Sequence, residues 1–183
     1  MHPIEAEVRQ WLDDIVIGLN LCPFAARPAR AGRVRVVVSE SREELDLLAE
    51  LQLELAKLDD TPTAEIETTL IAVPHMLADF AEYNDFFDQV DGLLDQFEWS
   101  GLYQVASFHP DYQFEGTLPD DAENLTNRAP YPLLHLLRED SVEAAIASHP
   151  DVDGIPDANI RKLREMDDAT RTRLFAYLAR GAR

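Results

Sequence analysis

Cysteine is almost absent from this sequence, since Cys22 is the only one among 183 residues. A single cysteine excludes an internal disulfide framework and a cysteine-rich zinc site. The chain also lacks an apolar run long enough to cross a bilayer. Its first residues, MHPIEAEVRQW, include early acids and show neither the basic nor the apolar region of a signal peptide. We therefore expect a cytoplasmic protein without a membrane partner.

Basic residues are scarce as well. The chain has 16 lysines and arginines against 35 aspartates and glutamates, which gives a formal net charge of −19. Nucleic-acid backbones and anionic membranes both bind cationic surfaces, so this charge weighs against either partner. Two segments supply most of the excess acid, from Glu40 to Glu67 and from Asp79 to Glu98, and the second contains no base. A small-molecule ligand is compatible with this composition.

Glycine contributes only seven residues, and neither a GxGxxG segment nor a Walker-type phosphate loop occurs. These absences leave no NAD or flavin fingerprint, while a divalent metal stays a candidate cofactor. The length suits one domain, and we expect residues 1–183 to form it.

Helices and strands are expected to alternate in the first 108 residues. Apolar residues at three- and four-residue steps predict helices, and short β-branched or apolar runs predict strands. In chain order these are a helix over 3–20, a strand over 34–38, a helix over 41–58, a strand over 68–74, a helix over 76–97 and a strand over 102–108. Ser41 followed by Glu44 matches a capping box at the start of the second helix.

This alternation favours an α/β fold with a small three-stranded, mainly parallel sheet and crossover helices. An α+β ferredoxin-like arrangement with antiparallel pairs is the alternative. The last third of the chain is expected to be helical. It contains LLHLLRE at 133–139, DSVEAAIASH at 140–149, a helix that begins at Pro156, and a final helix capped by Asp167.

Residues 109–130, which we call the polar loop, show neither a helical nor a strand period. Loops of this length inside small domains are usually functional or disordered. His109 directly follows the third predicted strand, where ligands of α/β sheets are usually bound. Because residues two apart in an extended segment project to the same side, His109 and Asp111 are candidates for a shared catalytic role. His109 would be the general acid or base, and Asp111 would orient it.

The same side chains also suit a metal ion. His109 and Asp111 would be joined by Glu115, Asp121 or His135, which gives the mix of nitrogen and oxygen ligands that zinc, manganese or iron accepts. The structural alternative is a turn for Asp111 and a hydrogen bond at the strand end for His109.

Asn124, Asn127 and Arg128 combine two amides with a guanidinium within five residues. These groups recognise anionic or polar ligands, so we expect them to bind substrate. The alternative is that the amides bond to the loop backbone and Arg128 pairs with a nearby acid. His135 and Arg138 share one side of the predicted 133–139 helix and are further substrate-binding candidates, although a core position is the alternative for His135.

Cys22 is a candidate nucleophile with His109 or His135 as its base and an Asn or Asp to orient that base. Its position just past the C-terminal end of the first predicted helix raises a thiol pKa, because the helix dipole is negative there. Burial as a small apolar side chain is therefore the alternative.

Three segments carry a resemblance to a known family. They are GLNLCPFA at 18–25, FHPDYQFEGTLPDDAENLTNRAPYPLLHLLRE at 108–139 and, less specifically, GIPDANI at 154–160. On these motifs the chain resembles, over most of its length, the bacterial conserved proteins grouped as domain-of-unknown-function family 1415. That family has no established activity, so the resemblance implies no catalytic role for any residue.

Two functions of different classes follow. The first is a small cytosolic enzyme, a hydrolase or group transferase, that acts on a small anionic or polar molecule through the polar loop. The second is a non-catalytic interaction protein that presents the acidic helices at 41–58 and 77–97 to a basic partner, with the polar loop as a structural plug. Convergence of the polar side chains on an open pocket favours the enzyme, and burial against backbone groups favours the plug.

Overall fold

A four-stranded sheet forms the centre of the protein. The computed structural model describes residues 1–180. Its strands are β1 (Val34–Val38), β2 (Thr68–Ala72), β3 (Tyr103–Phe108) and β4 (Leu133–Arg138), in the order β1-β2-β4-β3. β1 and β2 are parallel, whereas β4 is antiparallel to both of its neighbours. The mixed α/β fold is confirmed, but the predictions of three strands and of mainly parallel pairing are wrong.

The extra strand, β4, is the LLHLLR segment that was predicted to be a helix. Its leucines alternate between the two faces of the sheet: Leu133 packs in one apolar cluster, and Leu134 and Leu136 pack in the other. Because helices cover both faces, leucine occupies positions on both sides of the strand. The sequence of this strand therefore lacks the alternation of apolar and polar residues that marks a half-buried strand, and a short apolar run of this kind is equally compatible with a helix.

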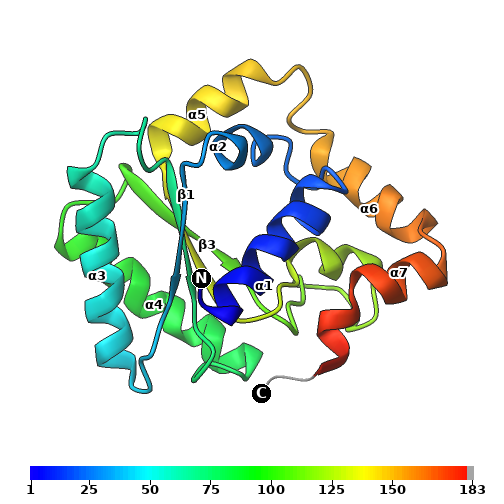
Figure 1. The fold of residues 1–183 in the computed structure, drawn as a ribbon, viewed down its shortest axis with the longest axis horizontal. Coiled ribbons are helices and arrows are strands. Elements are labelled where there is room, and N and C mark those ends of the chain that lie inside the picture. The colour runs from blue at the N-terminus through cyan, green and yellow to red at the C-terminus, as the bar shows by residue number, and fades with distance from the viewer. Residues whose placement is uncertain (181–183) are drawn as a thin grey trace.

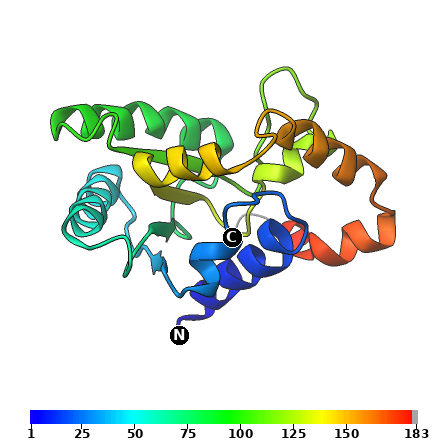
Figure 2. The same ribbon diagram turned by 90° about the horizontal axis from the view of Figure 1, so that it is seen from above.

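Helices cover both faces of the sheet (Figures 1 and 2). α3 (Glu44–Asp60) and α4 (Phe80–Gln96) lie on one face, and α1 (Pro3–Trp11) lies on the other. The core under α3 and α4 includes Leu47, Leu51, Leu55, Tyr83, Phe86 and Val90. The core under α1 includes Val8, Trp11, Leu70, Leu125, Leu133 and Leu163.

The first predicted helix, 3–20, consists of two parts. α1 passes into a wider π-helical segment, η1 (Leu12–Ile17). A Cβ atom at Gly18 would collide with the carbonyl oxygen of Asp14, so the end of this segment requires glycine.

The predicted capping box at the start of α3 is wrong. α3 begins at Glu44 without a side-chain cap. The hydroxyl of Ser41 donates instead to the carboxylate of Glu50 at 3.2 Å. α4 begins at Phe80, four residues later than predicted, because Asp79 accepts hydrogen bonds from the backbone N–H groups at the helix start.

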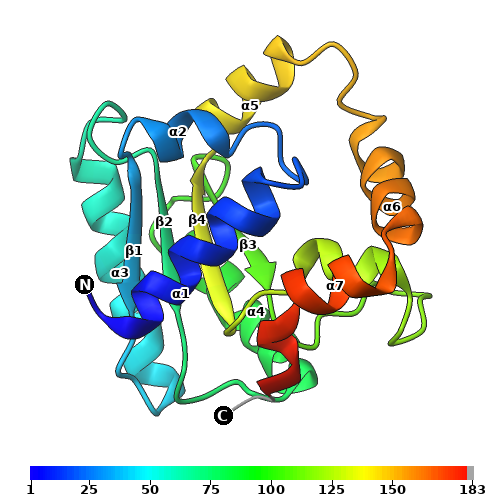
Figure 3. The same ribbon diagram turned by 45° about the vertical axis from the view of Figure 1, so that its right-hand side comes forward.

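Helices of the C-terminal part pack beside the end of α1 (Figure 3). The Asp167 cap is confirmed, since its carboxylate accepts from the N–H of Thr170 at 2.9 Å. The helix at Pro156 is confirmed as well. The remaining elements are α2 (Ala26–Arg30), η2 (Ala122–Asn127), α5 (Glu139–Ser148), α6 (Ile155–Glu165), α7 (Asp168–Leu174) and η3 (Ala176–Arg180). Among the helices of residues 1–180, none is both long and apolar enough to cross a membrane.

Candidate functional site

His109 lies at the end of β3 with both ring nitrogens occupied. Its Nδ1 accepts a hydrogen bond from the backbone N–H of Asp111 at 3.0 Å. Nε2 must therefore carry the proton, and it donates to the carbonyl of Leu77 at 3.0 Å. The ring is fully buried between Phe80 and Tyr83. Burial lowers the pKa of His109 below its ordinary value, so the ring is held neutral with no nitrogen free for a substrate.

The candidate metal ligands do not gather around an ion site. Asp111 and Glu115 are exposed, whereas His109 is buried. Asp121 turns back onto its own loop, where its carboxylate accepts from the N–H of Leu118 at 2.8 Å. Within residues 1–180, no three His, Cys, Asp or Glu side chains are placed so that they could hold a metal ion.

Asn124 organises the middle of the polar loop. Its side-chain oxygen accepts from the N–H of Phe114 and from the hydroxyl of Thr117, both at 2.9 Å. Its amide nitrogen donates to the carbonyl of Leu118 at 2.7 Å. The side chain is buried, so it bonds to the loop in the way that the structural alternative described.

Asn127 and Arg128 connect the polar loop to its surroundings. The amide of Asn127 donates to the carbonyl of Ser107 in β3 at 3.1 Å. The guanidinium of Arg128 donates to the carbonyls of Tyr112 at 3.1 Å and Pro119 at 2.7 Å. The structural alternative paired Arg128 with an acid, but its partners are two backbone oxygens, which are acceptors that a loop without regular structure must satisfy.

His135 lies in β4 and contacts Thr68 of the neighbouring strand. The Thr68 hydroxyl donates to the carbonyl of Leu136 at 2.6 Å and lies 2.8 Å from Nε2 of His135. Because the hydroxyl proton is used, Nε2 of His135 is the donor of the second bond. Burial lowers the pKa of His135 to about 4, so this histidine is also neutral near pH 7.

Arg138 lies at the end of β4, far along the strand from the polar loop. One guanidinium nitrogen lies within 3.0 Å of the carbonyls of Leu58, Thr61 and Ile66. It therefore holds the C-terminal end of α3 and the segment that leads into β2.

Cys22 packs with the apolar cluster under α1, while the ring of His109 contacts Phe80 and Tyr83 of the opposite face. Burial raises the pKa of the Cys22 thiol. The cysteine and His109, one of its two candidate bases, are therefore not brought together, whereas the ring of His135, the other candidate base, packs against Phe108 on the same side of the sheet as Cys22.

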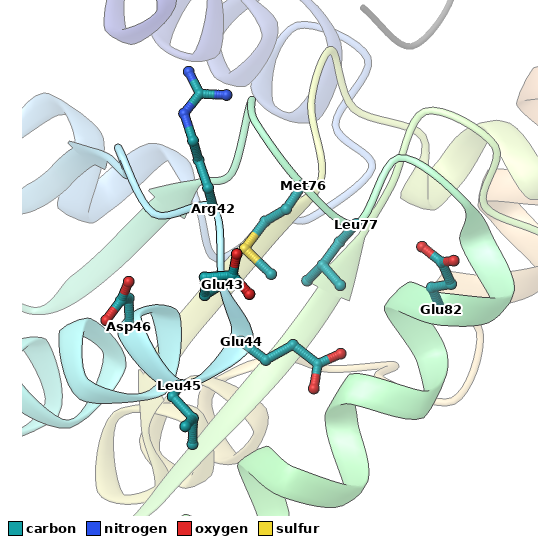
Figure 4. A pocket seen from close by; sticks show the side chains of 8 residues that line it. All are labelled: Arg42, Glu43, Glu44, Leu45, Asp46, Met76, Leu77 and Glu82. Atoms are coloured by element: carbon teal, nitrogen blue, oxygen red, sulfur yellow. The ribbon is translucent and has the colours of Figure 1, made fainter.

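A cavity of about 680 Å³ lies at the N-terminal ends of α3 and α4, and none of its lining residues was a catalytic, substrate-binding or metal candidate in the sequence (Figure 4). Its lining consists of Arg42, Glu43, Glu44, Leu45, Asp46, Met76, Leu77 and Glu82. Glu44 extends from α3 toward α4, Met76 lies at the centre, and Arg42 points away from the other side chains (Figure 4). The loops that follow the parallel strands β1 and β2, together with the first turns of α3 and α4, supply this lining. Ligands of α/β sheets are usually bound at this end of the strands.

This cavity lies at one end of an acidic surface on α3 and α4. The two helices lie side by side, and the amide of Gln89 in α4 donates to Glu44 in α3 at 2.7 Å. We call this surface the acidic face and define it by the exposed carboxylates of Glu44, Asp46, Glu82, Asp85, Asp88 and Asp91. The signal was present in the sequence as a base-free acid run, but the sequence alone does not place the two helices together.

Comparison with known proteins identifies a family for this chain but assigns no activity to it. No curated protein and no solved structure matches the chain. The model of a family described as "protein of unknown function (DUF1415)" matches residues 3–173. The protein therefore belongs to the DUF1415 family.

Proposed function

We propose that this protein is a non-catalytic interaction protein that binds a basic partner through the acidic face. The observation that carries the proposal is the side-by-side placement of two acid-rich helices. α3 contains six acids and one base, and α4 contains five acids and no base. Within the described part of the chain, none of the six carboxylates that define the acidic face forms an ion pair.

Glu44, Asp46 and Glu82 lie in the first turns of their helices, where the helix dipole favours a negative charge. Asp85, Asp88 and Asp91 lie further along α4, where like charges repel one another without that benefit. A cationic partner would remove this repulsion and would be steered to the face by its field. Since surface charges are screened over roughly 8 to 10 Å at physiological ionic strength, binding of this kind weakens as salt is added.

The hydrogen bonds of the polar loop support the same proposal from another direction. His109, Asn124 and Arg128 satisfy backbone groups, which suits a structural plug between the sheet and the C-terminal helices. An enzyme that used these side chains for acid/base chemistry would have to break bonds that hold the loop in place.

A binding titration of the full chain with a fluorescent lysine-rich peptide tests the proposal. The decisive variant is Asp85→Asn/Asp88→Asn/Asp91→Asn, which removes three exposed charges from α4. The matched control, Asp120→Asn/Asp153→Asn/Glu165→Gln, removes three exposed charges elsewhere. We expect the α4 variant to bind at least about tenfold more weakly than the wild type and the control to stay within about twofold. An equal loss of affinity in both variants would contradict binding at the acidic face, because the affinity would then depend only on the net charge of the protein.

A further inference from the structure

Leucines stand on the outer side of α3 as well as in its core. Leu45 and Leu53 are 79% and 70% exposed. With the exposed Ala49 between them they form a line at four-residue steps, which we call the leucine stripe. Leu47, Leu51, Leu55 and Leu58 already fill the interior side of this helix. The stripe therefore contributes nothing to the core and leaves apolar surface in water.

The leucine stripe leads directly into the cavity. Leu45 is both the first residue of the stripe and part of the cavity lining, which also includes Met76 and Leu77. The same wall carries the carboxylates of Glu44, Asp46 and Glu82. The stripe and the cavity thus share Leu45, and carboxylates lie in the same cavity wall.

We infer that the leucine stripe and the cavity together accept one helix of a protein partner, apolar on one side and rich in lysine or arginine along its edges. This inference rests on the proposed function and specifies the partner. The stripe covers eight residue steps, roughly 12 Å, which two to three turns of a second helix would match. Leucine-type side chains of the partner pack on Leu45 and Leu53, and a lysine or arginine enters the cavity.

Long cationic side chains suit this cavity chemically. Their aliphatic stems pack against apolar surface while their charged ends stay near carboxylates or water. Here Met76 and Leu77 would contact the stem, and Glu44 or Glu82 would receive the charge.

Charge complementarity favours this occupant over others. A second copy of the chain would bring another net charge of −19 to the face. An anionic membrane would be repelled for the same reason. A small polyamine would satisfy the carboxylates but would leave the leucine stripe exposed.

Two synthetic peptides of about 14 residues, roughly 21 Å long as helices, test the inference with the full chain. In the first, lysines and leucines occupy opposite sides of a helix. The second has the same composition in an order that spreads the leucines around the helix. Affinity is measured by fluorescence anisotropy for the wild type, for Leu45→Gln/Leu53→Gln, and for the control Leu118→Gln/Ile146→Gln, whose leucine and isoleucine are also exposed.

The wild type and the control should bind the amphipathic peptide at least about tenfold more tightly than the rearranged one, on the scale of burying two leucines. The Leu45→Gln/Leu53→Gln variant should lose this preference. If both peptides bind the wild type with equal affinity, the helix inference is overturned. If both peptides then bind the Asp85→Asn/Asp88→Asn/Asp91→Asn variant more weakly than the wild type, the proposed function still stands. If neither peptide binds, both fail. A dimer that dissociates in the Leu45→Gln/Leu53→Gln variant would assign the stripe to a second copy and overturn the inference as well.

Discussion

Nε2 of His109 donates to the carbonyl of Leu77 at 3.0 Å and thereby joins the segment after β3 to the segment after β2. Leu77 lines the cavity at the start of the acidic face. The histidine is thus bonded to the backbone of a residue that lines the cavity, and it is not itself part of that lining.

Replacing this histidine should destabilise the fold. His109→Ala leaves the Leu77 carbonyl without its donor and opens a void between Phe80 and Tyr83. We expect the free energy of unfolding in urea to fall by about 2 to 4 kcal/mol. His75→Ala is the control, since the ring of that exposed histidine lies 3.3 Å from the exposed carboxylate of Glu40 and its removal should change stability by less than about 1 kcal/mol. A His109→Ala protein with unchanged stability would restore His109 as a candidate catalytic group.

Stability should also fall in mild acid because of His135. Burial lowers the pKa of His135 to about 4 in the folded protein, while the unfolded chain titrates near 6.5. Between these two values the unfolded state binds more protons, so stability is complete above about pH 6.5 and decreases as the pH falls toward 4.

Urea unfolding near pH 7 and near pH 5 measures this effect. Between pH 7 and pH 5, the free energy of unfolding of the wild type should fall by on the order of 2 kcal/mol more than that of His135→Gln, because the variant lacks the titrating group. His109, whose pKa is also lowered, adds the same sign of change to both proteins and cancels in the comparison. Parallel losses in the two proteins would show that His135 titrates normally in the fold.

Arg138 should hold the C-terminal end of α3. Arg138→Met removes the donor shared by the carbonyls of Leu58, Thr61 and Ile66. We expect the free energy of unfolding to fall by about 1 to 3 kcal/mol and amide hydrogen exchange over residues 58–66 to become faster. The exposed Arg161→Met is the control and should leave both quantities unchanged. Unaltered exchange over 58–66 in Arg138→Met would argue against this role.

The thiol of Cys22 should react slowly. Burial raises its pKa, and the ring of His109 lies against the other face of the sheet. The rate of iodoacetamide alkylation should therefore have its midpoint above about pH 8.5, the value of an ordinary cysteine. A midpoint below about 7.5 would return Cys22 to the list of nucleophiles.

Local sequence patterns were sufficient to predict some helix caps and strands but not others. Asp167 caps its helix through a neighbour three residues away, so sequence alone predicts it. Ser41 fits a capping pattern equally well, yet its hydroxyl bonds to Glu50, which the fold brings close. β4 was missed because burial on both faces removes its period.

The candidate site shows the same division. The sequence drew attention to Asn124 and Arg128 by residue type, but their partners are backbone carbonyls, which carry no signal in a sequence. The acid run of α4 was visible, whereas its placement beside α3 depends on the packing of Phe86 and Val90 against the core.

The most direct test of the acidic face is an amide-resolved NMR titration of the isotopically labelled full chain with the amphipathic lysine-rich peptide. We predict chemical-shift changes concentrated in α3, in α4 and at Met76 and Leu77, with loss of those changes as salt is raised. Changes concentrated in the polar loop around Asp111 and Asn127, with α3 and α4 unaffected, would contradict the proposed function and place the binding site at the loop.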